Sequence, residues 1–152
     1  MRRPAAEDAI LIQDLYARYS WALDTGDTDA YVELYLPDAV VHETTPEGVR
    51  HVTGHDQIRE FVMRFHGNPA FPGRQHRTSQ LVILPDPQDR PDHWLVRGYV
   101  HTTENPPGGP PRLFWCGHTE DIVAKRDGEW FIATREIRPW EGDVLARFAA
   151  EG

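Results

Sequence analysis

Asp24 and His76 are the two residues whose types and positions suggest chemistry. Asp24 ends an apolar, aromatic-rich segment, and His76 opens a strand-like segment 52 residues later. A carboxylate that binds one ring nitrogen of a histidine fixes its tautomer and leaves the other nitrogen free to act as a base near neutral pH. Because a chain with eight histidines offers many chance pairs, the surrounding segments must show whether these two meet.

Length and composition indicate one soluble domain over residues 1–152. The net charge of −8 argues against a nucleic-acid partner, which would require a basic surface. No apolar run is long enough to span a membrane, and the polar N-terminus does not resemble a signal peptide. Cys116 is the single cysteine, so no internal disulfide can form, and we expect a cytoplasmic protein.

The first part of the chain predicts helices. Apolar residues recur with a helical period, Gly26 is suited to a helix end, and Asp27 or Thr28 can cap the next helix. Pro37 should end that second helix. The expected elements are helices at 6–23, 29–36 and 57–66, with a strand at 39–44 before the third helix.

The rest of the chain predicts strands rich in Val, Ile, Thr, Trp and Phe. Asp127-Gly128 is a strong signal for a two-residue hairpin, and the proline-rich stretches 85–91 and 105–111 fit longer hairpin loops. Helices followed by hairpin-linked strands indicate an α+β fold. The expected strands are 75–84, 93–104, 112–126 and 129–138, and a short helix is expected within 142–150.

Other kinds of site find little support. His51 and His55 have a spacing that could hold a metal on a helix face, but a presumed helix start at Thr53 and Gly54 separates them, and no third ligand accompanies them. We therefore expect no metal and no cofactor. The chain has no glycine-rich phosphate loop or nucleophile elbow, and Cys116 has the surroundings of a core residue.

Several short motifs resemble the nuclear transport factor 2-like, or SnoaL-like, superfamily. They are Ile12-Gln13-Asp14-Leu15-Tyr16, Leu23-Asp24 before a glycine turn, Tyr35-Leu36-Pro37-Asp38-Ala39 and Gly128-Glu129-Trp130-Phe131-Ile132. The resemblance covers residues 8 to 140. It implies a cone-shaped, mostly antiparallel curved sheet wrapped around a cavity, with three N-terminal helices. Because this fold hosts many activities, the resemblance by itself says little about function.

Within the superfamily the chain resembles scytalone dehydratase, with hexachlorocyclohexane dehydrochlorinase and bile-acid dehydratase nearly as similar. Asp24 and His76 match the paired Asp and His of these enzymes, His101 matches a second cavity histidine, and Tyr19 matches a functional tyrosine of the bile-acid enzyme. Residues 137–148, with Trp140 and Phe148, resemble a C-terminal lid, so residues 141–152 would form a tail or lid. Leu23 and the His42-Glu43 pair replace two substrate-holding tyrosines, which argues against scytalone as the substrate.

The remaining candidates would bind the substrate. If strand residues alternate, His101 shares a face with Tyr99, Arg97 and Thr103, a mixture suited to a cavity wall. Only one of His42 and Glu43 can point inward, and the sequence leaves the choice open. The other substrate-binding candidates are His118, which could face the cavity or pack in the sheet, and the aromatic residues Trp21, Tyr99 and Trp140.

These residues predict a lyase of the dehydratase type that acts on a small apolar or aromatic molecule without a cofactor. His76 would remove a proton from carbon, Asp24 would orient it, and Tyr19 or His101 would hydrogen-bond the developing oxyanion. An isomerase, a cyclase or an epoxide hydrolase could use the same dyad. A non-catalytic binding or assembly module, such as the small subunit of a ring-hydroxylating dioxygenase, is the second class. The resemblance also implies a homo-oligomer, either a dimer or a trimer.

Overall fold

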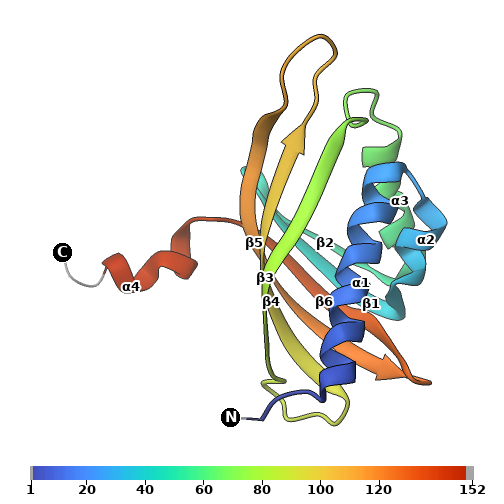
Figure 1. Cartoon of the computed structure of the whole chain (residues 1–152), viewed down its shortest axis with the longest axis vertical. Coiled ribbons are helices and arrows are strands. Elements are labelled where there is room, and N and C mark those ends of the chain that lie inside the picture. Colours follow the sequence, from blue (N-terminus) through green and yellow to red (C-terminus); the bar gives the residue numbers. More distant parts are fainter. Residues whose placement is uncertain (1, 150–152) are drawn as a thin grey trace.

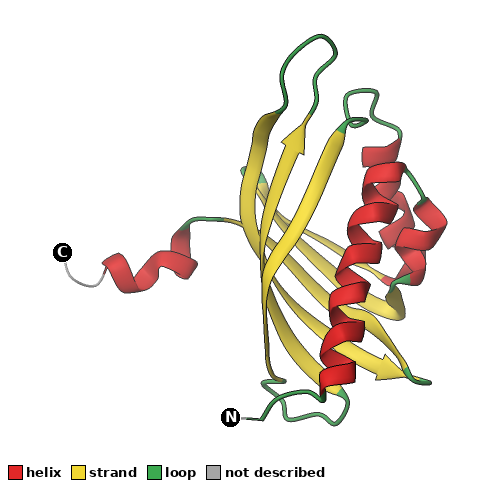
Figure 2. Ribbon diagram, viewed as in Figure 1, coloured by secondary structure: helices red, strands yellow, loops and turns green. Residues whose placement is uncertain are grey.

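The protein is a curved sheet with helices against one of its faces. A computed structural model describes residues 2–149. Figure 1 shows α1, α2 and α3 on the concave side of the sheet, while α4 projects from the other side. Figure 2 shows the same two layers coloured by type of structure. The α+β class, the curved sheet and the three N-terminal helices predicted from the sequence are confirmed.

Six strands form the sheet in the order β2-β1-β6-β5-β4-β3. All neighbouring strands are antiparallel except β1 and β6, which are parallel. The sheet is not closed, because β2 and β3 form its two edges. The strands are β1 (Tyr35–Thr45), β2 (Gly48–Thr53), β3 (Arg74–Pro85), β4 (His93–Glu104), β5 (Arg112–Arg126) and β6 (Glu129–Pro139).

The helices begin and end where local signals place them. The helix α1 (Ala6–Thr25) stops at Gly26, whose φ of 79° is readily adopted by glycine. In α2 (Thr28–Glu33), the Asp27 side chain accepts a hydrogen bond from the Ala30 amide (3.0 Å) and caps the first turn. The helix α3 (Gly54–His66) places Ile58, Phe61 and Val62 against the sheet.

Two sequence predictions between α1 and α3 were wrong. The second helix ends at Glu33 instead of residue 36, and β1 already includes Pro37. A register shift between Tyr35 and Val40 in the pairing of β1 with β6 accommodates this proline, which has no amide hydrogen to donate. The short edge strand β2 was not predicted; it has only six residues, and most of its side chains are exposed.

The hairpin predictions hold. Asp127 and Gly128 both have positive φ angles (52° and 88°), as a tight turn between β5 and β6 requires. The two proline-rich stretches connect antiparallel partners. After β6 the chain leaves the sheet through a 3-10 turn, η1 (Gly142–Leu145), and α4 (Ala146–Ala149). The last residue of the predicted terminal helix, Ala150, lies outside the described residues.

Candidate active site

The structure brings Asp24 and His76 together. The His76 ring donates from Nδ1 to Asp24 Oδ1 (2.6 Å), and the His76 backbone amide donates to Asp24 Oδ2 (2.7 Å). Both oxygens of the carboxylate are therefore used by one residue. Since an ionised carboxylate can only accept, the ring must carry its proton on Nδ1 when it is neutral, which leaves Nε2 as a free acceptor.

The end of α1 is held in place by contacts other than the dyad. His66 of α3 bonds the Leu23 carbonyl through Nε2 (2.9 Å) and the Thr28 hydroxyl through Nδ1 (2.8 Å). On the other side, the Phe71 ring stacks on His76 with its centroid 5.8 Å away and the planes 22° apart. The imidazole is consequently fixed by both a hydrogen bond and a packed ring, as a positioned base requires.

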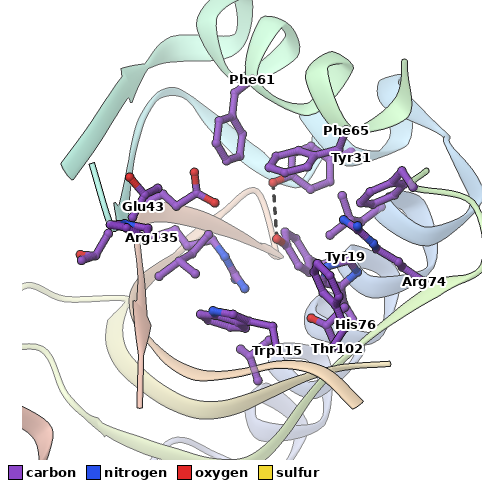
Figure 3. A pocket seen from close by; sticks show the side chains of 18 residues that line it. Tyr19, Tyr31, Glu43, Phe61, Phe65, Arg74, His76, Thr102, Trp115 and Arg135 are labelled. Atoms are coloured by element: carbon purple, nitrogen blue, oxygen red, sulfur yellow. Dashed lines mark hydrogen bonds between the residues drawn. The ribbon is translucent and has the colours of Figure 1, made fainter. Parts of the chain in front are cut away.

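His76 lines a cavity of about 240 Å³ between the helices and the concave face of the sheet. Figure 3 shows the side chains that surround this space. Its walls are mostly apolar and aromatic, which is typical of sites for small organic molecules. The apolar lining comprises Leu23, Pro46, Phe61, Phe65, Phe71, Val100, Phe114, Trp115 and Ile137.

Tyr19 contributes a hydroxyl to this cavity. Tyr35 donates to the Tyr31 hydroxyl (3.0 Å), and Tyr31 donates weakly to that of Tyr19 (3.5 Å). All three rings are almost completely buried, and burial raises the pKa of Tyr31 and of Tyr35 well above 10. Since the Tyr19 oxygen accepts from Tyr31, its own proton is available to a ligand, and Tyr19 is suited to act as a neutral donor.

Arg135 places a buried positive charge beside Tyr19. Its Nη1 donates to Asp121 Oδ2 (2.9 Å), and its guanidinium carbon lies 4.0 Å from the centroid of the Tyr19 ring. Tyr16 donates to the same Asp121 oxygen (2.8 Å). Burial raises the pKa of Asp121 to about 6, although Arg135 opposes that change. The pair is oriented with its guanidinium on the cavity side, since Arg135 lines the cavity and Asp121 does not.

Glu43, and not His42, lines the cavity. Glu43 Oε2 accepts from Arg50 Nη1 (2.8 Å) on the neighbouring strand β2, and burial raises the pKa of the Glu43 carboxyl. His42 points to the other face of the sheet, where its ring packs edge-on against His51 at 4.6 Å. The sequence left open which of His42 and Glu43 points inward. In the structure, the alternation of side chains along β1 directs Glu43 into the cavity.

The expectation that His101 lies in the cavity must be corrected. On β4 the buried residues are the even-numbered ones, including Val96, Val100 and Thr102, and His101 is exposed. Val100 and Thr102 line the cavity. The sequence offered a usable signal, since the even-numbered residues from Trp94 to Thr102 carry no charged side chain, whereas Arg97 lies among the odd-numbered ones.

Tyr99, His118 and Trp140 also lie on the outer face. Trp140 packs edge-on against Tyr99 (5.0 Å) and His118 (5.7 Å). Asp121, three residues after His118 on β5, reaches α1, so His118 must point the opposite way. Burial under Trp140 lowers the pKa of His118. None of the three lines the cavity, so the predicted substrate-binding place of Tyr99 and Trp140 is wrong, and of the two alternatives for His118 the structure shows packing in the sheet.

The prediction that Trp21 binds the substrate is wrong, and of the two alternatives for the C-terminal segment, tail or lid, the described part matches a tail. Trp21 is 74% exposed on α1 and does not line the cavity, because the helical period turns it away from Tyr19 and Leu23. Phe148 is 85% exposed, and residues 141–149 project from the sheet on the side away from the helices (Figure 1), so these residues do not form a lid over this cavity.

Sequence reasoning missed two cations that line the cavity, Arg74 and Arg135. The guanidinium of Arg74 lies 4.0 Å from the Phe114 ring centroid. An arginine in a strand normally indicates a solvent-facing position, so the sequence carried no signal for either. Residues 2–149 contain no group of three or more His, Cys, Asp or Glu side chains able to hold a metal ion. Within the same range, no helix is long and apolar enough to cross a membrane.

Comparison with known proteins finds both a family and many similar structures. Residues 4–136 match the profile of the SnoaL-like domain family. Among curated proteins, none matches the chain.

Three solved structures from Novosphingobium aromaticivorans illustrate the fold. A proposed scytalone dehydratase is 24% identical, with a TM-score of 0.71 over 88% of this chain and 85% of that one. A proposed aromatic ring hydroxylase is 23% identical, with a TM-score of 0.76 over 92% and 94%. The beta subunit of a proposed aromatic-ring-hydroxylating dioxygenase is 16% identical, with a TM-score of 0.74 over 88% and 90%. At these identities the similarity shows a shared fold.

Proposed function

Since the chain belongs to the SnoaL-like family, we propose that it is a cofactor-independent lyase that removes water from a compact, largely apolar or aromatic carbonyl compound. The observation that carries this proposal is the doubly bonded Asp24–His76 pair at the wall of an aromatic cavity. A ligand that fills the cavity and excludes water would strengthen the polar contacts made within it.

His76 Nε2 takes the proton from the carbon next to the substrate's carbonyl group, and the electron pair of the broken C–H bond moves onto the carbonyl oxygen. Asp24 stabilises the imidazolium that forms. The electron pair then returns to form the double bond and expels the hydroxyl group, which takes a proton from the imidazolium and leaves as water. General-base catalysis of this kind is worth about 10²–10⁴-fold in rate.

Tyr19 stabilises the intermediate oxyanion. Its hydroxyl proton is free, since Tyr31 is the donor within the tyrosine chain. Arg135 lies against the Tyr19 ring, and its charge favours negative charge at the oxygen that Tyr19 binds. Interactions that strengthen as charge develops are the ones that accelerate the reaction.

The cavity limits the size of the substrate. Its volume of about 240 Å³ is just below the roughly 300–1,000 Å³ of typical small-molecule sites. A one- or two-ring molecule would occupy most of it, so such a substrate contacts His76 and Tyr19 together.

A β-hydroxy tetralone, which becomes a naphthol on losing water, is a suitable test substrate. We expect loss of the mass of one water, and a rate that falls at least about 10²-fold in the His76→Ala variant. His93→Ala, at the start of β4 and away from this cavity, is the matched control. Unchanged turnover in His76→Ala would refute the mechanism.

The same dyad supports an isomerase, a cyclase or an epoxide hydrolase, and product mass separates them. An unchanged mass indicates isomerisation or intramolecular cyclisation, and the gain of one water indicates hydration. A second test needs no leaving group: the enzyme should exchange the α-protons of α-tetralone for deuterium in D2O. Failure of both exchange and turnover would favour a non-catalytic binding module.

The expected homo-oligomer and cytoplasmic location remain proposals. The exposed rings of Tyr99 and Trp140 on the outer sheet face, beside the projecting tail with Phe148, support association with a second copy. Light scattering of the purified chain tests this, because a monomeric mass would contradict it. Cell fractionation tests the location.

A further inference from the structure

Glu43 and Arg135 lie at the opposite end of the cavity from His76. In the order of strands, β1 and β6 are neighbours near one edge of the sheet, whereas β3 is the other edge. Arg135 pairs with Val41 in the register of β1 and β6, so Glu43, two residues further along, is its diagonal neighbour on the same face. Figure 3 shows both side chains on one side of the cavity and His76 on the other.

Each of these two groups has an unused polar atom. Glu43 bonds Arg50 through Oε2 only, and no described residue bonds its Oε1. Arg135 is 1% exposed, and its buried Nε has no partner among the described residues. A buried polar atom without a partner costs free energy, so a ligand group that reaches Arg135 Nε from the cavity would be favoured, and the half-buried Glu43 carboxylate keeps one oxygen available to the same ligand. Burial also raises the pKa of Glu43, although Arg50 opposes that change.

A hydroxyl group can donate and accept at the same time, so a single hydroxyl between Glu43 and Arg135 would suit both groups. Its hydrogen can be donated to a carboxylate, and its oxygen can accept from a guanidinium. We propose that the ligand carries a phenolic or alcoholic hydroxyl at the end remote from the reacting carbon, and that this hydroxyl donates to Glu43 and accepts from Arg135. Glu43 is then a specificity-determining residue, and the substrate class narrows to hydroxylated one- or two-ring carbonyl compounds.

Glu43 also discriminates against anions. A ligand carboxylate in the same place would accept from Arg135 but would face the Glu43 oxygens without a proton to share. The negative charges of the ligand carboxylate and of Glu43 would repel each other, and an unpaired charge in a buried site is costly. A neutral hydroxyl should therefore bind better than a carboxylate of the same ring, despite the two arginines in the wall.

Calorimetric titration with three naphthalene probes tests this inference: naphthol, its methyl ether and naphthoate. A hydrogen bond to a charged group predicts about tenfold or tighter binding of naphthol than of the ether, and naphthoate should bind most weakly. In Glu43→Gln the advantage of naphthol should fall several-fold and naphthoate should gain affinity. Glu47→Gln, in the exposed turn between β1 and β2, should change neither.

Equal binding of naphthol and its ether to the unaltered protein would overturn the inference, and so would an unchanged preference in a folded Glu43→Gln protein. Glu43→Met, which keeps the side-chain length without polar atoms, provides a second variant if the glutamine protein does not fold. The inference rests on the proposed function, because it assumes that the reacting carbon lies beside His76, but the titration measures binding and needs no turnover. Repeating the titration with the His76→Ala protein separates the binding inference from the proposed function, because the preference for naphthol should survive where catalysis is lost.

Discussion

Replacing Asp24 with asparagine should move the proton of the neutral His76 ring from Nδ1 to Nε2. Asp24 accepts from two donors of the same residue, the backbone amide (2.7 Å) and ring Nδ1 (2.6 Å). Asparagine offers one acceptor oxygen and one NH₂ donor. The backbone amide cannot become an acceptor, but the imidazole can exchange its tautomer. The asparagine oxygen should therefore bind the backbone, and its NH₂ group should donate to Nδ1.

The size of this effect follows from the lost pairing. Retaining the Nδ1–H tautomer would leave a donor facing a donor, at a cost of about 1–3 kcal/mol for the unsatisfied group. That cost corresponds to roughly a ten- to hundredfold preference for the Nε2–H tautomer. Nε2 then no longer has a free electron pair for a carbon-bound proton. Turnover of any substrate that reacts through His76 should fall by up to about 10⁴-fold, as it does when an aspartate–histidine pair of a catalytic triad is changed in this way.

Long-range ¹H–¹⁵N correlation spectra of the imidazoles measure the tautomer without any substrate. In the unaltered protein at alkaline pH, His76 should be protonated on Nδ1, and in Asp24→Asn on Nε2. Asp14→Asn, exposed on α1 and paired with Arg18, should leave the His76 signals unchanged. If the unaltered protein already carries the proton on Nε2, or if the asparagine variant keeps it on Nδ1, the reasoning about the dyad fails.

Three further predictions concern stability and can be checked by urea unfolding. Two side-chain hydrogen bonds and one backbone hydrogen bond from Arg90 lower the pKa of Asp86 to about 2. Asp86→Asn should therefore lower the free energy of unfolding by about 2 kcal/mol at neutral pH. The difference in stability between the two proteins should be complete above about pH 4 and should disappear as the pH falls through 2. Tyr16→Phe keeps the ring but removes the buried donor to Asp121, and should cost about 1–3 kcal/mol. Gly117→Ala would make the new methyl group clash with the Trp115 ring and the Arg138 carbonyl, and should cost about 1–3 kcal/mol and change the tryptophan fluorescence.

The sequence by itself determined the features that depend on neighbouring residues. The helical period of residues 6–23, the glycine stop at Gly26 and the turn at Asp127-Gly128 are local properties of the chain, so the main elements and the α+β class were predictable. The residues around Asp24 and His76 were predictable as candidates for a different reason, since their positions resemble those of known enzymes. Pro37 was misleading, because a proline stops a helix in isolation but is tolerated at an irregular strand pairing.

Only the tertiary structure decided which side chains share the cavity. Strand alternation gives two faces, and the curvature of the sheet and the helices packed on it select one of them, which places Thr102 inside and His101 outside. Arg135 is buried because Asp121 on β5 compensates its charge, and the register shift between Ile122 and Val123, which the turn at Asp127-Gly128 does not reveal, places the two opposite each other. Glu43 and His76 face one cavity although four strand-to-strand steps separate β1 from β3, since the sheet curls and brings its edges toward each other. Pairings of this kind are long-range consequences of packing, which a reading of local pattern does not contain.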